Sequence, residues 1–224
     1  LDFDHIGWKS YVSFLALAIG VAKFCDARLG AAAIILTIPV IWIGQHAQRN
    51  HLWARYIAMF YWIIPIIAGY LTILTAFLYQ PSNKILGKLN DALSGRLYFG
   101  HLALTRYHLN LFGQKVIENG FGGNSGQQLA NGNDLSKYFY IDSSFLRVVI
   151  LYGIIMFILI LIAMSAISWI SIKQGNFVLA SILVIVTVSA IVEQRLIDIS
   201  YDPFLLALFA NCYYQIKNKN GDKL

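Results

Sequence analysis

Charged residues are scarce in this chain: Asp, Glu, Lys and Arg form only 12% of its 224 residues, while 58% are hydrophobic. Soluble domains usually carry about 25% charged residues. This deficit excludes an ordinary soluble globular domain. At about 20 residues for each membrane crossing, the chain instead has room for several transmembrane helices and one long loop.

Cysteine is nearly absent as well. Cys25 and Cys212 are the two cysteines, and they offer neither a disulfide framework nor the spacing of a metal site. The net charge of +6 could suggest nucleic acid as a partner, but the basic residues lie scattered between apolar runs and form no basic stripe. The composition therefore predicts that the chain interacts with the lipid bilayer and does not bind nucleic acid.

Six uncharged or nearly uncharged segments predict an all-α integral membrane protein with about six transmembrane helices. The segments are 10–22, 29–44, 56–79, 148–172, 174–192 and 203–216. The third and fourth are each long enough to cross a hydrocarbon core of about 30 Å. The first and last are short, so each is a span completed by its flanks or an interfacial or re-entrant piece. Pro39 and Pro65 fall inside predicted spans, where proline is expected to kink a helix.

Lysine and arginine in the short connections predict the orientation, because these residues are retained on the cytoplasmic side. The connection 45–55, the turn at Lys173 and the C-terminal tail carry such charges. The connections 23–28, 79–147 and 193–202 are then expected to face outward together. Lys23 and Arg28 depart from the rule, while the long connection is exempt because long loops cross largely regardless of charge.

The long connection, residues 80–147, predicts one large extracytoplasmic loop that contains helices, within a single membrane domain of residues 1–224. Residues 86–116 have helical composition, with Asn90 or Ser94 as a possible N-cap. Residues 118–134 are rich in glycine and polar residues, which is typical of a flexible linker.

Ionisable groups beside hydrocarbon are costly, so those on the predicted outer side are candidate functional residues, although snorkelling at the interface also explains such groups. They are Arg28, Arg96, Arg106, Asp142, Arg147, Glu193, Arg195, Asp198 and Asp202. Arg96 would share a helix face with Gly100, Ala103 and Tyr107, which leaves room for a ligand or another helix. Its planar guanidinium suits phosphate. The histidines lack the spacing of a chelating pair, so neither metal nor cofactor is expected.

Three stretches resemble the bacterial O-antigen ligase and polysaccharide polymerase superfamily, in the same order along the chain. They are Ser94-Gly95-Arg96 through Leu111-Phe112-Gly113, Asp142-Ser143-Ser144-Phe145-Leu146 with Leu151-Tyr152-Gly153-Ile154, and Ala27-Arg28-Leu29-Gly30-Ala31. Gly100 stands where the family often has tryptophan. Asp142 stands where ligases carry histidine, which favours a polymerase. Because such proteins have about twice as many spans, the resemblance also implies that this chain is a C-terminal half.

The resemblance implies polymerisation of polyprenyl-pyrophosphate-linked oligosaccharides into capsular polysaccharide or exopolysaccharide, at the outer face of the bacterial cytoplasmic membrane. Arg28 and Arg96 would neutralise the leaving pyrophosphate, and Asp142 or Glu193 would be the base. Candidate substrate-binding residues are Arg106, Tyr107, Gly113, Arg147 and Arg195. A flippase and a chain-length regulator are the implied protein partners. Two alternatives remain open: ligase-type transfer to another acceptor, and a membrane transporter or channel subunit.

Overall fold

The described part of the chain is built from helices joined by turns and loops. The computed structural model describes residues 7–24, 28–118, 139–194 and 196, without the side chain of Arg28. This confirms the predicted all-α class for these ranges. Three helical stretches are long and apolar enough to cross a membrane, namely Leu29–Gln48, Leu52–Leu78 and Gly153–Lys173.

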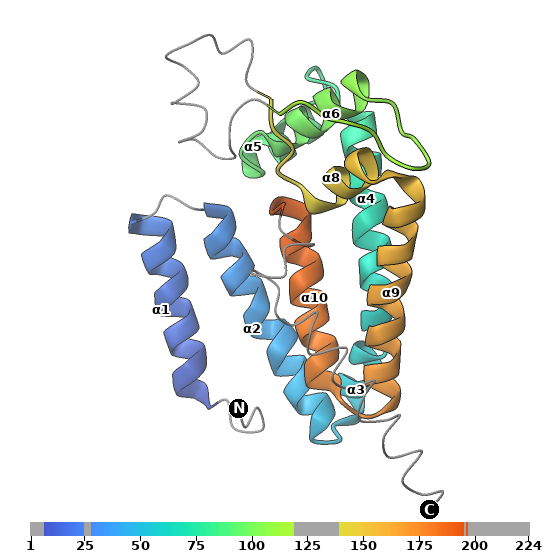
Figure 1. Ribbon diagram of the computed structural model, residues 1–224. Coiled ribbons are helices and arrows are strands. Elements are labelled where there is room, and N and C mark those ends of the chain that lie inside the picture. Colours follow the sequence, from blue (N-terminus) through green and yellow to red (C-terminus); the bar gives the residue numbers. More distant parts are fainter. Residues whose placement is uncertain (1–6, 25–27, 119–138, 195, 197–224) are drawn as a thin grey trace, which may run out of the picture. The chain divides into compact units, whose positions relative to one another are not determined.

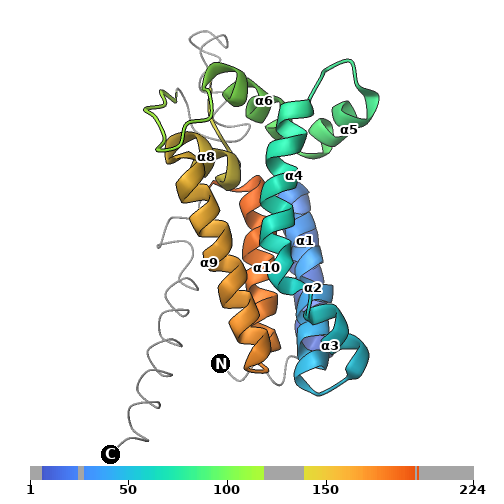
Figure 2. The same cartoon turned by 90° about the vertical axis from the view of Figure 1, so that its right-hand side faces the viewer.

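The long helices of residues 7–194 pack side by side (Figures 1 and 2). Helix α1 (Trp8–Phe24) packs against α2 (Arg28–Gln48), and α2 packs against α10 (Phe177–Val192). Helix α10 in turn contacts α9 (Gly153–Lys173) and α4 (Ile64–Leu78). These five helices form the body on which the remaining elements rest.

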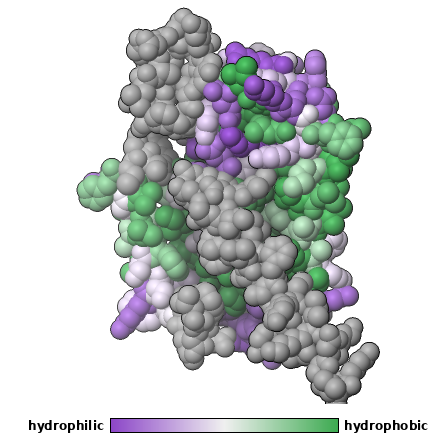
Figure 3. All heavy atoms as spheres, viewed as in Figure 1, coloured by the Kyte–Doolittle hydropathy of each residue, from purple (hydrophilic) through white to green (hydrophobic). Residues whose placement is uncertain are grey.

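Large apolar side chains stay exposed on the outer faces of the helices. On α9, Ile158, Leu159 and Ile162 keep 47%, 55% and 57% of their surface exposed. Figure 3 shows hydrophobic residues along the middle of the helices and hydrophilic residues gathered near their ends. A transmembrane bundle needs an apolar surface where it meets the hydrocarbon core and a polar surface near its ends. The observed surface therefore supports the interpretation as a membrane protein.

The predicted span 56–79 falls almost entirely within the candidate span Leu52–Leu78, which is divided into three helical elements. Helix α3 (Leu52–Ala58) ends, a 3-10 turn η2 (Tyr61–Ile63) follows, and α4 begins at Ile64. Pro65 lies in the first turn of α4, where its missing N–H removes no intrahelical hydrogen bond. It therefore marks a helix start, whereas Pro39 lies inside α2 as predicted.

The predicted span 148–172 is also divided. Its first residues belong to α8 (Ser144–Leu151), and α9 begins at Gly153, whose φ is +92°. The backbone N–H groups of Ile154 and Ile155 donate to the carbonyls of Asn110 (3.0 Å) and Leu111 (3.3 Å). The first turn of a helix leaves such donors without partners, so this loop segment caps α9.

Of the other predicted spans, 29–44 lies within the candidate span Leu29–Gln48, and the rest are shorter than a typical crossing or lie outside the described residues. Helix α10 has 16 residues and is apolar, and α1 has 17 residues. Both are shorter than the roughly 20 residues of a typical crossing. The segment 203–216 lies outside the described residues. A total of six spans therefore stays a prediction.

The predicted loop 80–147, expected to contain helices, contributes two of them before α8. They are α5 (Lys84–Ala92) and α6 (Arg96–Arg106). The Asn83 side chain caps α5. The N-cap residue of α6 is Gly95, and the side-chain oxygen of Asn90 accepts the backbone N–H of Tyr98 in the first turn of this helix (2.8 Å). Of the two expected caps, Asn90 thus bonds to the first turn of α6 from its place in α5, whereas Ser94 lies in the turn between the two helices. Of the predicted glycine-rich linker, only its first residue is described.

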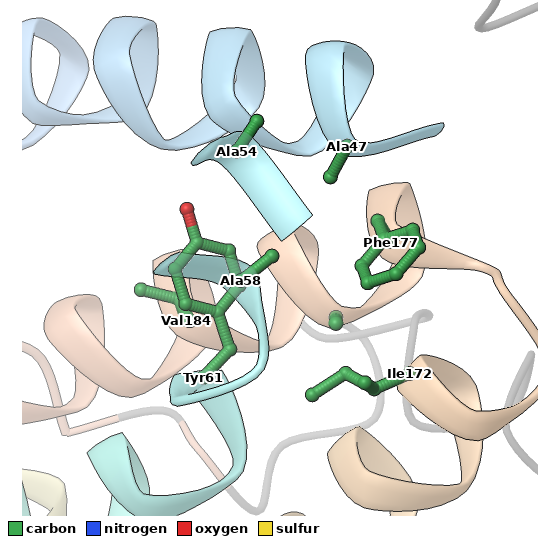
Figure 4. Packing of buried hydrophobic residues seen from close by; sticks show 8 residues of the cluster. Ala47, Ala54, Ala58, Tyr61, Ile172, Phe177 and Val184 are labelled. Carbon is green, nitrogen blue, oxygen red and sulfur yellow. The ribbon is translucent and has the colours of Figure 1, made fainter. Parts of the chain in front are cut away.

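The described connections group at two ends of the bundle (Figure 1). At the α3 end, residues 45–59 meet residues 169–177, and the Phe177 N–H donates to Gln48 Oε1 (3.0 Å). Helices α5, α6 and α8 lie at the opposite end, here called the loop end. A buried cluster consolidates the α3 end (Figure 4); it comprises Ala47, Ala54, Ala58, Tyr61, Ile172, Phe177, Ala180 and Val184.

Replacing Gly153 by alanine is expected to destabilise the protein. A Cβ there would overlap the backbone of Leu111 and Gly113, and the left-handed conformation alone costs roughly 1–2 kcal/mol. We expect the apparent Tm in detergent to fall by about 5 °C or more. Gly175→Ala is the matched control, since its φ is +74° but no atom lies within 4 Å of the added Cβ. If Gly153→Ala were as stable as Gly175→Ala, the close packing of Gly153 against the backbone of Leu111 and Gly113 would be contradicted.

Candidate functional site

Arg96 joins the start of α6 to the end of α10. Its Nε donates to the carbonyl of Val192 (2.8 Å), and its Nη2 lies 4.0 Å from Glu193 Oε1. The Arg96 side chain is only 18% exposed, whereas that of Glu193 is 58% exposed. A cation at a helix C-terminus is stabilised by the partial negative charge of the last carbonyls. The guanidinium is therefore held by the backbone of α10, with Glu193 beside it.

The segment before α8 lies against the same end of α10. The Ser144 N–H donates to the carbonyl of Glu193 (3.0 Å), which also accepts a short hydrogen bond from Ser144 Oγ. Ser143 Oγ donates to the carbonyl of Ala190 (3.5 Å). These bonds fix the position of Asp142, the residue that precedes the two serines.

Arg147 ties three separate segments together. Its Nη1 donates to Glu118 Oε1 (2.7 Å) and to Gln194 Oε1 (3.0 Å). Glu118 Oε1 also accepts the backbone N–H of Ile141 (3.2 Å). The two charged side chains are 25% and 16% exposed. This half-buried ion pair therefore holds the extended segment that carries Asp142.

Asp142 is the residue with the most unusual electrostatic surroundings. Burial raises the pKa of its carboxyl above the ordinary aspartate value. The Arg96 guanidinium opposes this increase, while the carboxylates of Glu193 and Glu118 add to it. Arg147 again lowers the pKa, but the net shift is upward. The proton affinity of Asp142 is thus set first by burial and then by the four charged groups around it.

The structure brings together four of the predicted site residues, Arg96, Asp142, Arg147 and Glu193. The sequence reasoning missed Glu118, because it was taken as the start of a linker. A signal was present, since Glu118 is the one acidic residue between positions 92 and 133. Such a lone acid in a basic region is a natural partner for a predicted arginine. We call these five residues the charged cluster.

Arg106 and Tyr107 form a second contact, centred on Phe139. The Arg106 guanidinium lies 4.9 Å from the centre of the Phe139 ring, and the Tyr107 ring lies 5.8 Å from it. The Tyr107 hydroxyl accepts the backbone N–H of Ile117 (3.2 Å). These contacts place both predicted substrate-binding residues where they hold residues 117 and 139 together.

Small residues of the loop end lie against other parts of the protein. A Cβ on Gly100 would lie 2.6 Å from Leu146 Cδ1 and 3.3 Å from Ala76 Cβ, and Ala103 is fully buried. The face of α6 below Arg96 is therefore occupied by α4 and α8. Gly113, with φ +82°, packs against the backbone of Leu151 and the following residue. Gly113 therefore lies where two backbone segments pass in close contact.

Several predicted residues cannot be placed in the cluster. Arg28 begins α2, but its side chain lies outside the described residues, as do Arg195, Asp198 and Asp202. Within the described ranges, no group of three or more His, Cys, Asp and Glu residues could hold a metal ion.

No protein-family model, curated protein or solved structure matches this chain.

The charged cluster combines two chemical capacities. Arg96 donates from Nε to the carbonyl of Val192 and from Nη1 to that of Leu93 (3.5 Å). Its Nη2 lies 4.0 Å from the Glu193 carboxylate, beyond hydrogen-bond distance, so among the described residues the Nη2 donors are available to an anionic ligand. Beside it, Asp142 has a raised pKa, which makes its carboxylate a better proton acceptor than an ordinary aspartate. The arrangement suits a reaction in which one group gains negative charge while another loses a proton.

Removing the negative charge of Glu193 is expected to lower the pKa of Asp142, because one of the causes that raise it disappears. The carboxyl band of Asp142 would be followed by infrared titration, with Asp142→Asn identifying the band. Glu193→Gln should shift the titration to lower pH. Glu193→Asp, which keeps the charge, is the control and should shift it less. An unchanged midpoint in Glu193→Gln would contradict the proposed coupling.

Proposed function

We propose that this protein is a membrane glycosyltransferase that polymerises oligosaccharide repeat units carried on polyprenyl pyrophosphate. The observation that carries the proposal is the pairing of Arg96, whose Nη2 donors are available, with Asp142, a carboxyl of raised pKa. Both lie at the loop end of a helical bundle with an apolar outer surface. The donor would keep its polyprenyl chain in the bilayer and present its pyrophosphate at this level.

In the proposed reaction, Asp142 accepts the proton of an acceptor sugar hydroxyl as the oxygen attacks the anomeric carbon of the donor. The bond from that carbon to the pyrophosphate oxygen breaks, and polyprenyl pyrophosphate leaves with inversion at the carbon. Arg96 stabilises the negative charge that develops on the leaving group. Arg28 has the same role by resemblance, and Arg147 positions the segment of Asp142 through Glu118.

The location of the charges favours this proposal over a transporter. In the three candidate spans, the charged residues lie near the ends of the spans, as Arg55 and Lys173 do. Transport pathways usually place such groups within the membrane interior. A reaction at the loop end needs no charged group in the middle of the described spans.

Replacing Arg96 is expected to impair polymerisation strongly. With purified protein and a lipid-linked repeat unit, Arg96→Ala should lower the rate by about 10²-fold or more, because one contact to the developing charge is lost. Lys88→Ala, an exposed cation of α5, is the control and should keep wild-type activity. Full polymer length from Arg96→Ala would overturn the assignment.

The same assay separates the two kinds of transfer, because a polymerase gives a ladder of products and a ligase gives a single transfer. Loss of activity with a chelator would contradict a metal-independent reaction.

Asp142→Asn is expected to abolish activity without destabilising the protein. A raised pKa means that folding favours the protonated carboxyl, so this stability is present below the ordinary aspartate pKa and is lost as pH rises through the folded-state value. At pH 7 the amide avoids the cost of the buried charge. The Tm should equal or exceed that of wild type at pH 7, and the difference should shrink in acid. A large fall in Tm at pH 7 would indicate a structural role instead.

A further inference from the structure

A groove opens at the α3 end of the bundle, on the side away from the charged cluster. It has a volume of about 490 Å³ and lies between α3, α9 and the start of α10. Leu52, Met59 and Trp169 contribute its apolar wall, and each stays at least 41% exposed. Arg55 and Lys173 also line it. The groove therefore combines an accessible apolar surface with two cations.

Each cation lies over an aromatic ring of the groove. The Arg55 guanidinium is 5.5 Å from the centre of the Phe177 ring, and Lys173 Nζ is 4.9 Å from that of Trp169. Such contacts hold a cation at an apolar surface without neutralising its charge. The two positive charges are thus retained at the groove.

No carboxylate from the neighbouring sequence is available to neutralise them. The sequence contains no Asp or Glu from position 28 to 90 or from 143 to 192, and these stretches supply every residue that lines the groove. Cations beside exposed apolar and aromatic side chains match the headgroup level of a bilayer. The complementary ligand carries a phosphate next to hydrocarbon.

We propose that this groove binds an anionic glycerophospholipid of the surrounding leaflet. Arg55 and Lys173 contact the headgroup phosphate, and an acyl chain lies along the wall formed by Met59 and Trp169. The predicted orientation places this end at the cytoplasmic leaflet, where basic pockets between helices bind anionic headgroups. The proposal does not depend on the reaction at the loop end.

Quenching of tryptophan fluorescence by brominated lipids tests the proposal in reconstituted protein. Brominated phosphatidylglycerol should quench Trp169 at about tenfold lower mole fraction than brominated phosphatidylcholine, because two cations select the anionic lipid. Trp169→Phe should remove most of this difference, and the double variant Arg55→Gln, Lys173→Gln should abolish it. Arg49→Gln is the matched control, since this cation lies at the same end but does not line the groove.

Three outcomes would overturn the proposal. Equal quenching by the two lipids would show that the groove does not select an anionic headgroup, or that another segment of protein covers it. A preference that persists in the double variant would place the lipid elsewhere. Displacement by soluble glycerol phosphate at millimolar concentration would show a site for the phosphate alone. Retained glycosyl transfer in the double variant would leave the proposed reaction intact, so the two proposals are separable.

Discussion

The end of α10 is the place on which the arrangement of the loop end depends. The last carbonyls of a helix have no intrahelical donors, and hydrocarbon supplies no water to replace them. Here the carbonyls of Ala190, Val192 and Glu193 accept hydrogen bonds from Ser143, Arg96 and Ser144. Two distant segments of the chain are thus drawn to one helix terminus. The charged cluster forms there because the donors that satisfy the backbone also carry or adjoin its charged side chains.

The start of α9 imposes the complementary requirement. Its first N–H groups need acceptors, and residues 110 and 111 provide carbonyls. The approach is close enough to require glycine at both positions 113 and 153. One part of the loop end is therefore held in place because it supplies donors to the end of α10. Another is held because it supplies acceptors to the start of α9. Backbone polarity positions these segments in addition to the contacts of their apolar side chains.

This explains which features the sequence could predict. Arg96, Asp142, Arg147 and Glu193 stood out because ionisable groups beside apolar runs are costly wherever the chain places them. Glu118 did not, because its partner lies 29 residues away across a glycine-rich stretch. A kink was expected at Pro65, but the sequence could not locate the helix breaks at 59–63 and at 152. The residues on both sides of each break are equally apolar. Hydropathy measures how favourable the transfer of a segment to lipid is, and it does not indicate where the backbone of that segment turns.

The two ends of the bundle hold their cations in opposite electrostatic surroundings. At the loop end, Arg96 lies 4.0 Å from Glu193, so a bound anion lies near a carboxylate that repels it and favours its exchange. At the α3 end, Arg55 and Lys173 line a groove whose neighbouring sequence contains no acidic residue. An anion bound there meets no competing carboxylate from these segments. Exchange suits a substrate that must leave after each reaction, whereas retention suits a lipid that remains part of the folded protein.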